Sequence, residues 1–127
     1  MIRDYAATDI EAVKELHEAQ GFDYALPDLS NPLFLVKKVK EVDGRVVAAC
    51  FLRVTAEAFL VVGGSPVSKG RALKELQPEV EREAYEKGLA EYICAIPPEI
   101  VKDFAPTLRR IGLEQTRDWP IFQRNLL

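Results

Sequence analysis

The dipeptide Asp43-Gly44 is the strongest constraint on how this chain folds. It lies between Phe34–Val42 and Val46–Val54, two runs rich in β-branched and apolar residues. Because Asp-Gly favours the positive backbone angles of a tight turn, the pattern predicts an antiparallel hairpin. A short break at Thr55-Ala56 predicts that Glu57–Val62 returns as a third antiparallel strand. The sequence therefore predicts a central meander.

Composition narrows the class of protein. A chain of 127 residues, 48% of them hydrophobic and 29% charged, predicts one globular domain over residues 1–127. The net charge of −3 argues against a nucleic-acid-binding face. We expect a cytoplasmic protein without a membrane partner, because neither a leader nor an apolar run of about 18 residues is present.

Cysteines and the histidine are not arranged for metal chemistry. Cys50 and Cys94 each lie in an apolar run, so we expect two buried free thiols. His17, the only histidine, is expected on the solvated side of the first helix. No spacing of metal ligands is present, and no metal site is predicted.

The remaining elements follow from capping and periodicity. Thr8 and Glu11 have capping-box spacing, which predicts a helix from Asp9 to the stop signal Gly21. The following loop, residues 22–32, carries Tyr24, which either anchors the loop to the core or lines a site. Further elements are expected at Arg71–Lys87 (helix), Leu89–Ile96 (buried strand), Pro97–Gly112 (helix), and Leu113–Trp119 with Ile121–Leu127 (hairpin, Pro120 in its bend).

The order of these elements predicts an α/β or α+β fold. We expect a mixed, mostly antiparallel sheet of six or seven strands with helices on both faces. The connection from Glu57–Val62 through a helix to Leu89–Ile96 predicts a parallel pair with a right-handed crossover. Pro78 predicts a kink or two consecutive helices within Arg71–Lys87.

A glycine turn precedes the long helix. Gly63-Gly64-Ser65-Pro66 leads into a helix whose first turn is expected to carry Lys69, Gly70 and Arg71. Helix-start amides and basic side chains attract anions, so this corner is a candidate anion-binding site. The alternative is an ordinary helix start with solvated basic residues.

The element order over the whole chain resembles the GNAT acyltransferase superfamily, the acyl-CoA N-acyltransferase fold. The local anchors of this resemblance are Ile2-Arg3 with Asp9, Val42-Asp43-Gly44-Arg45-Val46-Val47-Ala48, the helix length from Gly70 to Gly88, and Arg110-Ile111-Gly112-Leu113. The resemblance implies that acetyl-CoA binds as cosubstrate in a wedge between the strands Glu57–Val62 and Leu89–Ile96.

The superfamily's Q/R-x-x-G-x-G/A phosphate loop falls here on Val67-Ser68-Lys69-Gly70-Arg71-Ala72. Val67 replaces the leading polar residue, so the chain resembles a divergent member with a degenerate loop. The implied cofactor-binding residues are Val62, Lys69, Gly70, Arg71 and Ala72.

Acetyl transfer to an amine needs a base, and often an acid that protonates the leaving thiolate. Leu108 stands where the superfamily often has its acidic tyrosine, so Tyr92 or Tyr24 could substitute; both could instead be packed aromatic residues. Glu57 is the candidate base, because partial burial at the start of its strand would raise its pKa. The alternative is that Glu57 is solvated or pairs with Arg53.

The resemblance implies an N-acetyltransferase that moves an acetyl group from acetyl-CoA to an amine on a small molecule or peptide. The competing interpretation is a catalytically silent binding or interaction module, since Val67 and Leu108 replace two expected polar groups. The apolar segment Trp119-Pro120-Ile121-Phe122 either closes the last hairpin or forms a homodimer contact.

Overall fold

The computed structural model describes residues 1–116 and 121–127 of the chain. The chain divides into two compact units, Met1–Thr55 (unit 1) and Ala56–Leu127 (unit 2), and each is described by itself. The expectation of a single domain over residues 1–127 stays a prediction.

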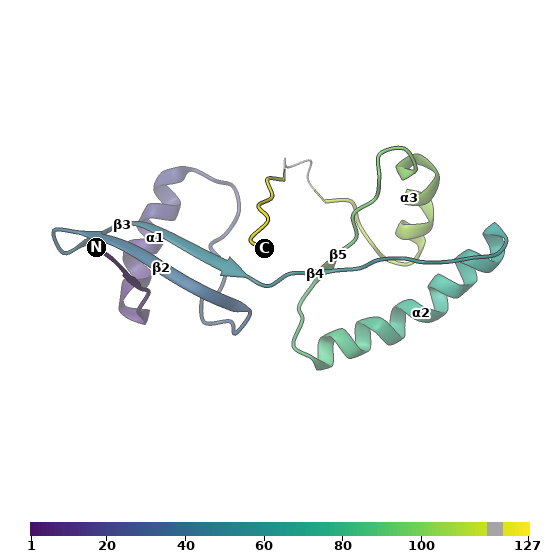
Figure 1. The fold of residues 1–127 in the computed structure, drawn as a ribbon, viewed down its shortest axis with the longest axis horizontal. Helices are drawn as coiled ribbons and strands as arrows, with labels where there is room; N and C mark the ends of the chain where they lie inside the picture. The colour runs from purple at the N-terminus through teal and green to yellow at the C-terminus, as the bar shows by residue number, and fades with distance from the viewer. Residues whose placement is uncertain (117–120) are drawn as a thin grey trace. The chain divides into compact units, whose positions relative to one another are not determined.

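Unit 1 is a three-stranded antiparallel sheet with one helix (Figure 1). Its elements in chain order are β1 (Ile2–Asp4), the 3-10 turn η1 (Ala7–Asp9), α1 (Ile10–Gln20), β2 (Phe34–Val42) and β3 (Arg45–Arg53). The strand order is β1-β2-β3, so β2 is central. The predicted hairpin is confirmed: Val42 pairs with Arg45, and the turn residues Asp43 and Gly44 have φ angles of 50° and 75°.

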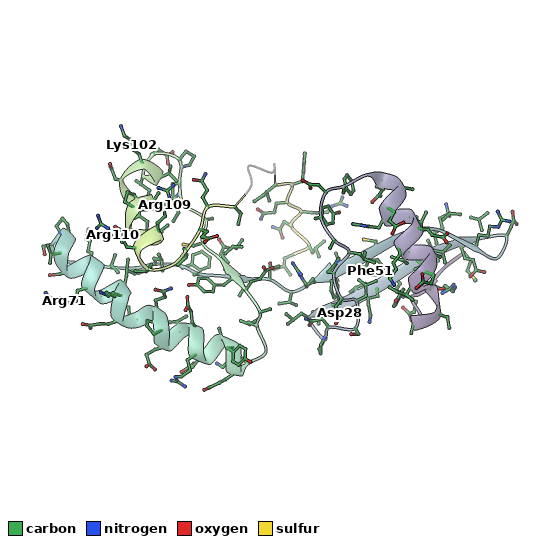
Figure 2. The ribbon with its side chains drawn as sticks, turned by 180° about the vertical axis from the view of Figure 1, so that it is seen from behind. Asp28, Phe51, Arg71, Lys102, Arg109 and Arg110 are labelled. Atoms are coloured by element: carbon green, nitrogen blue, oxygen red, sulfur yellow. The ribbon has the colours of Figure 1, made fainter. Side chains whose placement is uncertain are left out.

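The core of unit 1 forms around the middle of β2. Val39 is only 1% exposed, and Val13 of α1 and Leu29 of the following loop are also buried. Phe51 of β3 makes edge-on ring contacts with Tyr5 and Phe34 (Figure 2).

Cys50 does not belong to this core. The prediction of a buried thiol is wrong for Cys50, which is exposed, whereas Cys94 is half-buried. Cys50 pairs with Lys38, next to the buried Val39, and alternation along a strand puts neighbouring side chains on opposite faces of the sheet. The apolar run around Cys50 therefore does not indicate that both faces of the sheet are buried there.

An ionic cluster fixes the start of the first helix. The Arg3 guanidinium donates to both carboxylate oxygens of Asp9, at 2.8 and 2.9 Å, and to Glu41 Oε2 at 2.8 Å. Asp9 also accepts a hydrogen bond from the Ala6 amide at 2.8 Å. The Asp9 carboxylate therefore caps η1 through the Ala6 amide, and α1 begins at Ile10 rather than Asp9, without a side-chain cap on its own first turn. Its predicted left-handed stop at Gly21 is confirmed, with φ of 71°.

Unit 2 contains β4 (Ala56–Glu57), α2 (Pro66–Glu86), β5 (Tyr92–Ile93) and α3 (Val101–Arg110). β4 and β5 form a parallel pair, as the crossover predicted. The expectation that Glu57–Val62 extends the meander antiparallel to β3 is wrong, because β4 pairs with β5. The described residues form one sheet of three strands and one of two, so a six- or seven-stranded sheet is not confirmed.

The long helix of unit 2 begins earlier than predicted. Ser65 is its N-cap, with the hydroxyl oxygen accepting from the Ser68 amide at 3.2 Å, and Pro66 occupies the first helical position. Proline lacks an amide hydrogen and has a helical φ, which suits that position. α2 then continues through Pro78 to Glu86, so the alternative of two consecutive helices is wrong.

The predicted closing hairpin is only partly covered by the structure. Its residues Trp119 and Pro120 lie outside the described residues, and neither 113–116 nor 121–127 is assigned to a strand. Within the described ranges, no helix combines the length and the apolar character that crossing a membrane would require.

Candidate functional site

The parallel pair in unit 2 is very short. Ala56 pairs with Tyr92 and Glu57 with Ile93, and the Ala58 amide adds a last hydrogen bond to the Ile93 carbonyl at 2.7 Å. Beyond this point, residues 59–62 and 94–96 belong to no strand and share no backbone hydrogen bond in the described part of the chain. The pairing therefore ends while both segments are still apolar in sequence.

Two large apolar side chains of residues 59–62 are exposed to solvent. Phe59 is 79% exposed and Val61 is 91% exposed. Backbone amide and carbonyl groups without a ladder partner can pair with an extended ligand, as in strand addition to a sheet edge. The point where β4 and β5 part is thus a place where an amide-containing chain could bind.

Tyr92 joins β5 to the long helix. Its hydroxyl donates to Glu81 Oε1 at 2.8 Å, and the same oxygen accepts from Gln77 Nε2 at 2.7 Å. Burial, together with the hydrogen bond to Glu81 and its negative charge, raises the pKa of Tyr92 to about 12. Tyr92 is therefore held neutral, with its proton directed at a carboxylate.

Cys94 and Glu57 lie near the same strand pair. Burial raises the pKa of the Cys94 thiol, and the charge of Glu57 raises it further. The Glu57 side chain is exposed, so the partial burial on which its role as base was argued is absent. Glu57 and Tyr92 do belong to paired strands, with Tyr92 opposite Ala56 and Ile93 opposite Glu57.

A cleft of about 720 Å³ opens between α2, β5, α3 and the segment after α3. Its lining includes Tyr92 from β5, Cys94 directly after β5, Glu81 from α2, and Leu108 and Arg109 from α3. Leu108 is 8% exposed and supplies apolar surface, so no hydroxyl replaces the missing tyrosine at that position. Figure 2 shows Arg109 and Arg110 at one end of α3 and Lys102 near the other.

The predicted phosphate loop has a different local structure. Because α2 begins at Pro66, the expected first turn at Lys69, Gly70 and Arg71 is wrong. The Lys69 amide already donates to the Ser65 carbonyl at 2.9 Å, and the later amides bond to carbonyls one helical turn before them. Phosphate binding by these amides is therefore not supported.

The side chains of the predicted loop remain accessible. Lys69 and Arg71 are exposed, and Arg71 points outward from α2 (Figure 2). Val62 and Ala72 are half-buried. The helix itself leaves the Val67 amide without an intrahelical carbonyl partner, because Val67 belongs to its first turn.

Tyr24 belongs to unit 1, whereas the residues just described belong to unit 2. Its ring stacks on Phe22 with centroids 5.4 Å apart and meets His17 edge-on at 5.1 Å. His17 is half-buried, and its Nε2 is buried without a hydrogen-bond partner among the described residues. The prediction of a solvated His17 is therefore wrong, since Tyr24 and the loop partly cover it.

Sequence reasoning missed Glu81 and Gln77. Their spacing of four residues places them on one face of α2, which was visible in the sequence. That this face meets Tyr92 depends on the crossover packing and has no local signal. Among residues 1–116 and 121–127, no group of three His, Cys, Asp or Glu side chains is placed to hold a metal ion.

Comparisons with known proteins give little further support. No protein-family model matches the chain, and no curated protein matches it. One solved structure, the aminoglycoside N-acetyltransferase AAC(6')-Iy in complex with CoA, covers 98% of this chain and 99% of its own, at 18% identity. The TM-score of 0.38 is too low for this likeness to support an argument about the site.

Proposed function

We propose that the chain is an acyl-CoA-dependent N-acyltransferase that binds acetyl-CoA where β4 and β5 part. The observation that carries this proposal is the short parallel pair, which ends at Glu57 and Ile93 with unpaired backbone on both continuing segments. The pantetheine arm of CoA contains two amides on a flexible chain, and such groups can bond to unpaired strand backbone. The resemblance in element order implies the same wedge.

The diphosphate of CoA would lie near the start of α2. Lys69 and Arg71 are exposed there, and the Val67 amide is in the first turn of the helix. Positive side chains and the helix dipole both favour an anion at this end. Contact through the side chains of Lys69 and Arg71 replaces the amide contacts that the sequence pattern implied.

In the reaction, the neutral amine nitrogen would attack the thioester carbonyl carbon. The carbon–sulfur bond breaks, the sulfur leaves as thiolate, and the nitrogen loses a proton to become the amide. Glu57 is the candidate base, because its exposed carboxylate lies on the strand where the pair parts. Tyr92 is the candidate acid for the thiolate.

The test is calorimetric titration of acetyl-CoA into the protein and into Lys69→Ala/Arg71→Ala. We expect acetyl-CoA to bind, and we expect the double substitution to weaken this binding about tenfold or more, because two charge contacts are lost. The difference between the two proteins should be smaller at high salt, because salt screens these contacts. Lys74→Ala/Lys87→Ala removes two positive charges from positions further along α2 and at its C-cap, and serves as the charge-matched control. Equal weakening in both variants, or no binding to the unsubstituted protein, would contradict the proposal.

A catalytically silent binding module is the second candidate, and the Tyr92 geometry favours it. A tyrosine whose pKa is raised to about 12 by burial and by Glu81 is a weaker proton donor than a free tyrosine. Leu108 supplies no substitute. Release of free CoA thiol with a panel of amines distinguishes the two: turnover that Glu57→Gln abolishes supports the enzyme, and binding without turnover supports the module.

A further inference from the structure

The cleft of unit 2 has walls suited to an apolar ligand. Three elements and the three segments that follow them contribute aliphatic side chains to it: Ala84, Leu89, Ile93, Ile96, Val101 and Leu113. Its volume of about 720 Å³ lies in the range typical of small-molecule sites. The body of a small organic molecule would bury apolar surface here.

Among the described residues that line the cleft, the charged groups are mostly negative. Its lining includes the carboxylates of Glu81, Glu91 and Glu114 and one guanidinium, that of Arg109. Glu81 is the best defined of these, because its Oε1 accepts from the Tyr92 hydroxyl and the Gln77 amide. Both donors are uncharged, and within the described ranges Glu81 forms no ion pair, so its negative charge is oriented but not neutralised.

Two ionisable side chains of the cleft, Tyr92 and Cys94, have pKa values that are shifted in the same direction. Tyr92 and Cys94 both line the cleft, and both have a raised pKa, first because of burial and then because of a nearby carboxylate. That carboxylate is Glu81 for Tyr92 and Glu57 for Cys94. Burial disfavours a charge of either sign, whereas the nearby carboxylates favour a cation over an anion.

We propose that this cleft binds a small amphiphilic primary amine, with an alkyl or aryl body against the aliphatic walls and the ammonium group at Glu81. The role of this amine as acyl acceptor rests on the proposed function, whereas its binding does not. Polar, highly hydroxylated amines fit less well, because hydroxyl groups placed against the aliphatic walls would lose their hydration.

The test compares three probes of nearly equal shape: phenylbutylamine, phenylbutanol and phenylbutyrate. Calorimetric titration at low salt should give an affinity for the amine about fivefold above that for the alcohol, the size of a partly exposed charge contact. The carboxylate should bind more weakly than the alcohol. Glu81→Gln should remove the preference for the amine and leave the affinity for the alcohol nearly unchanged.

Glu75→Gln is the matched control, since it removes one exposed carboxylate from the same helix outside the cleft lining. It should keep the preference for the amine. Ala105→Phe, which fills the cleft from α3, should weaken binding of amine and alcohol alike. Far-ultraviolet circular dichroism verifies that each variant is folded.

Three results would overturn the inference: equal affinity for amine and alcohol, a preference that survives Glu81→Gln, or tightest binding of the carboxylate. The last would assign the cleft to an anion held by Arg109. Acetyl-CoA is titrated in parallel. Acetyl-CoA binding without amine binding overturns this inference alone, and amine binding without acetyl-CoA binding overturns the proposed function alone.

Discussion

In unit 1 the carboxylate of Asp9 is bonded to a cation, Arg3, whereas in unit 2 the carboxylate of Glu81 has only uncharged partners within the described residues. The first arrangement holds the pKa of Asp9 down at about 2, chiefly through the hydrogen bond from Arg3 and then that from the Ala6 amide. The pKa of Tyr92, which donates to Glu81, is raised, first by burial and then by this hydrogen bond. The charge of Asp9 is balanced within unit 1, whereas the charge of Glu81 has no cationic partner among the described residues of unit 2.

The hydrophobic cores of the units differ in the same sense. Unit 1 buries Val39, Val13 and Leu29 together, around the centre of its sheet. Among the described residues of unit 2 the buried apolar side chains are Leu73 and Leu108, and Leu108 also borders the cleft. Unit 1 thus has a closed apolar core, whereas part of the apolar surface of unit 2 faces the cleft where we propose that a ligand binds.

The largest effect is expected from Leu73→Ala in α2. Leu73 is 4% exposed, and removing a buried leucine side chain costs about 3 kcal/mol in the free energy of unfolding. Leu76→Ala, on the same helix at 54% exposure, should cost under about 1 kcal/mol. Urea denaturation measures both. Equal losses of stability in the two variants would contradict this prediction, since Leu73 would then not be part of a hydrophobic core in unit 2.

The next effect is a shift of about two pH units at Tyr92. Its pKa is raised from 10.0 to about 12, first by burial and then by Glu81, so its stabilising contribution is fully present below pH 10 and is lost as pH rises toward 12. NMR of protein labelled at tyrosine Cζ follows this titration, and Tyr92→Phe assigns the signal. Glu81→Gln should lower the pKa of Tyr92 but leave it above 10, because burial remains. No change in that variant would contradict the contact with Glu81.

Local chemistry explains which parts of this fold the sequence could predict. The hairpin was predictable because Asp43-Gly44 determines its turn without help from the rest of the chain. The start of α2 also has a local signal, Ser65-Pro66, but the resemblance placed the phosphate loop on Val67–Ala72, inside the helix. An N-cap serine and a proline at the first helical position determine a helix start through local hydrogen bonding and geometry. A short glycine motif does not determine where a helix begins.

The pairing of β4 could not be predicted in the same way. Glu57–Val62 is apolar enough for a strand, but its partner is chosen by packing across the crossover and not by a local turn. The candidate site has the same limit: Tyr92 was identified as a chemical group, while its contact with Glu81 required the structure. The sequence could therefore identify candidate residues, but it could not predict which residues they contact.

A smaller effect is expected from acid titration of unit 1. The pKa of Asp9 is lowered from 3.8 to about 2, so the stability that it contributes is present above about pH 4 and is lost as pH falls toward 2. Asp9→Asn should lower stability at pH 7 and flatten this dependence, as followed by circular dichroism. Asp28→Asn, which alters an exposed turn carboxylate bonded to Ser30, is the control and should change the profile less. If the stability of Asp9→Asn depended on acid pH as that of the unsubstituted protein does, the ion pair of Asp9 would not contribute to the stability of unit 1.

The smallest effect concerns the start of α2, where unit 2 caps a helix with a hydroxyl instead of a carboxylate. Ser65→Ala removes the oxygen that accepts from the Ser68 amide and should cost about 1 kcal/mol in the free energy of unfolding. Ser65→Asp should restore the cap and add a favourable charge at the positive end of the helix dipole. Ser68→Ala, which keeps the amide and removes only the neighbouring hydroxyl, should cost less. If Ser65→Asp stabilises the helix but weakens acetyl-CoA binding, the same helix end serves both the fold and the anion, because an added carboxylate there repels the diphosphate.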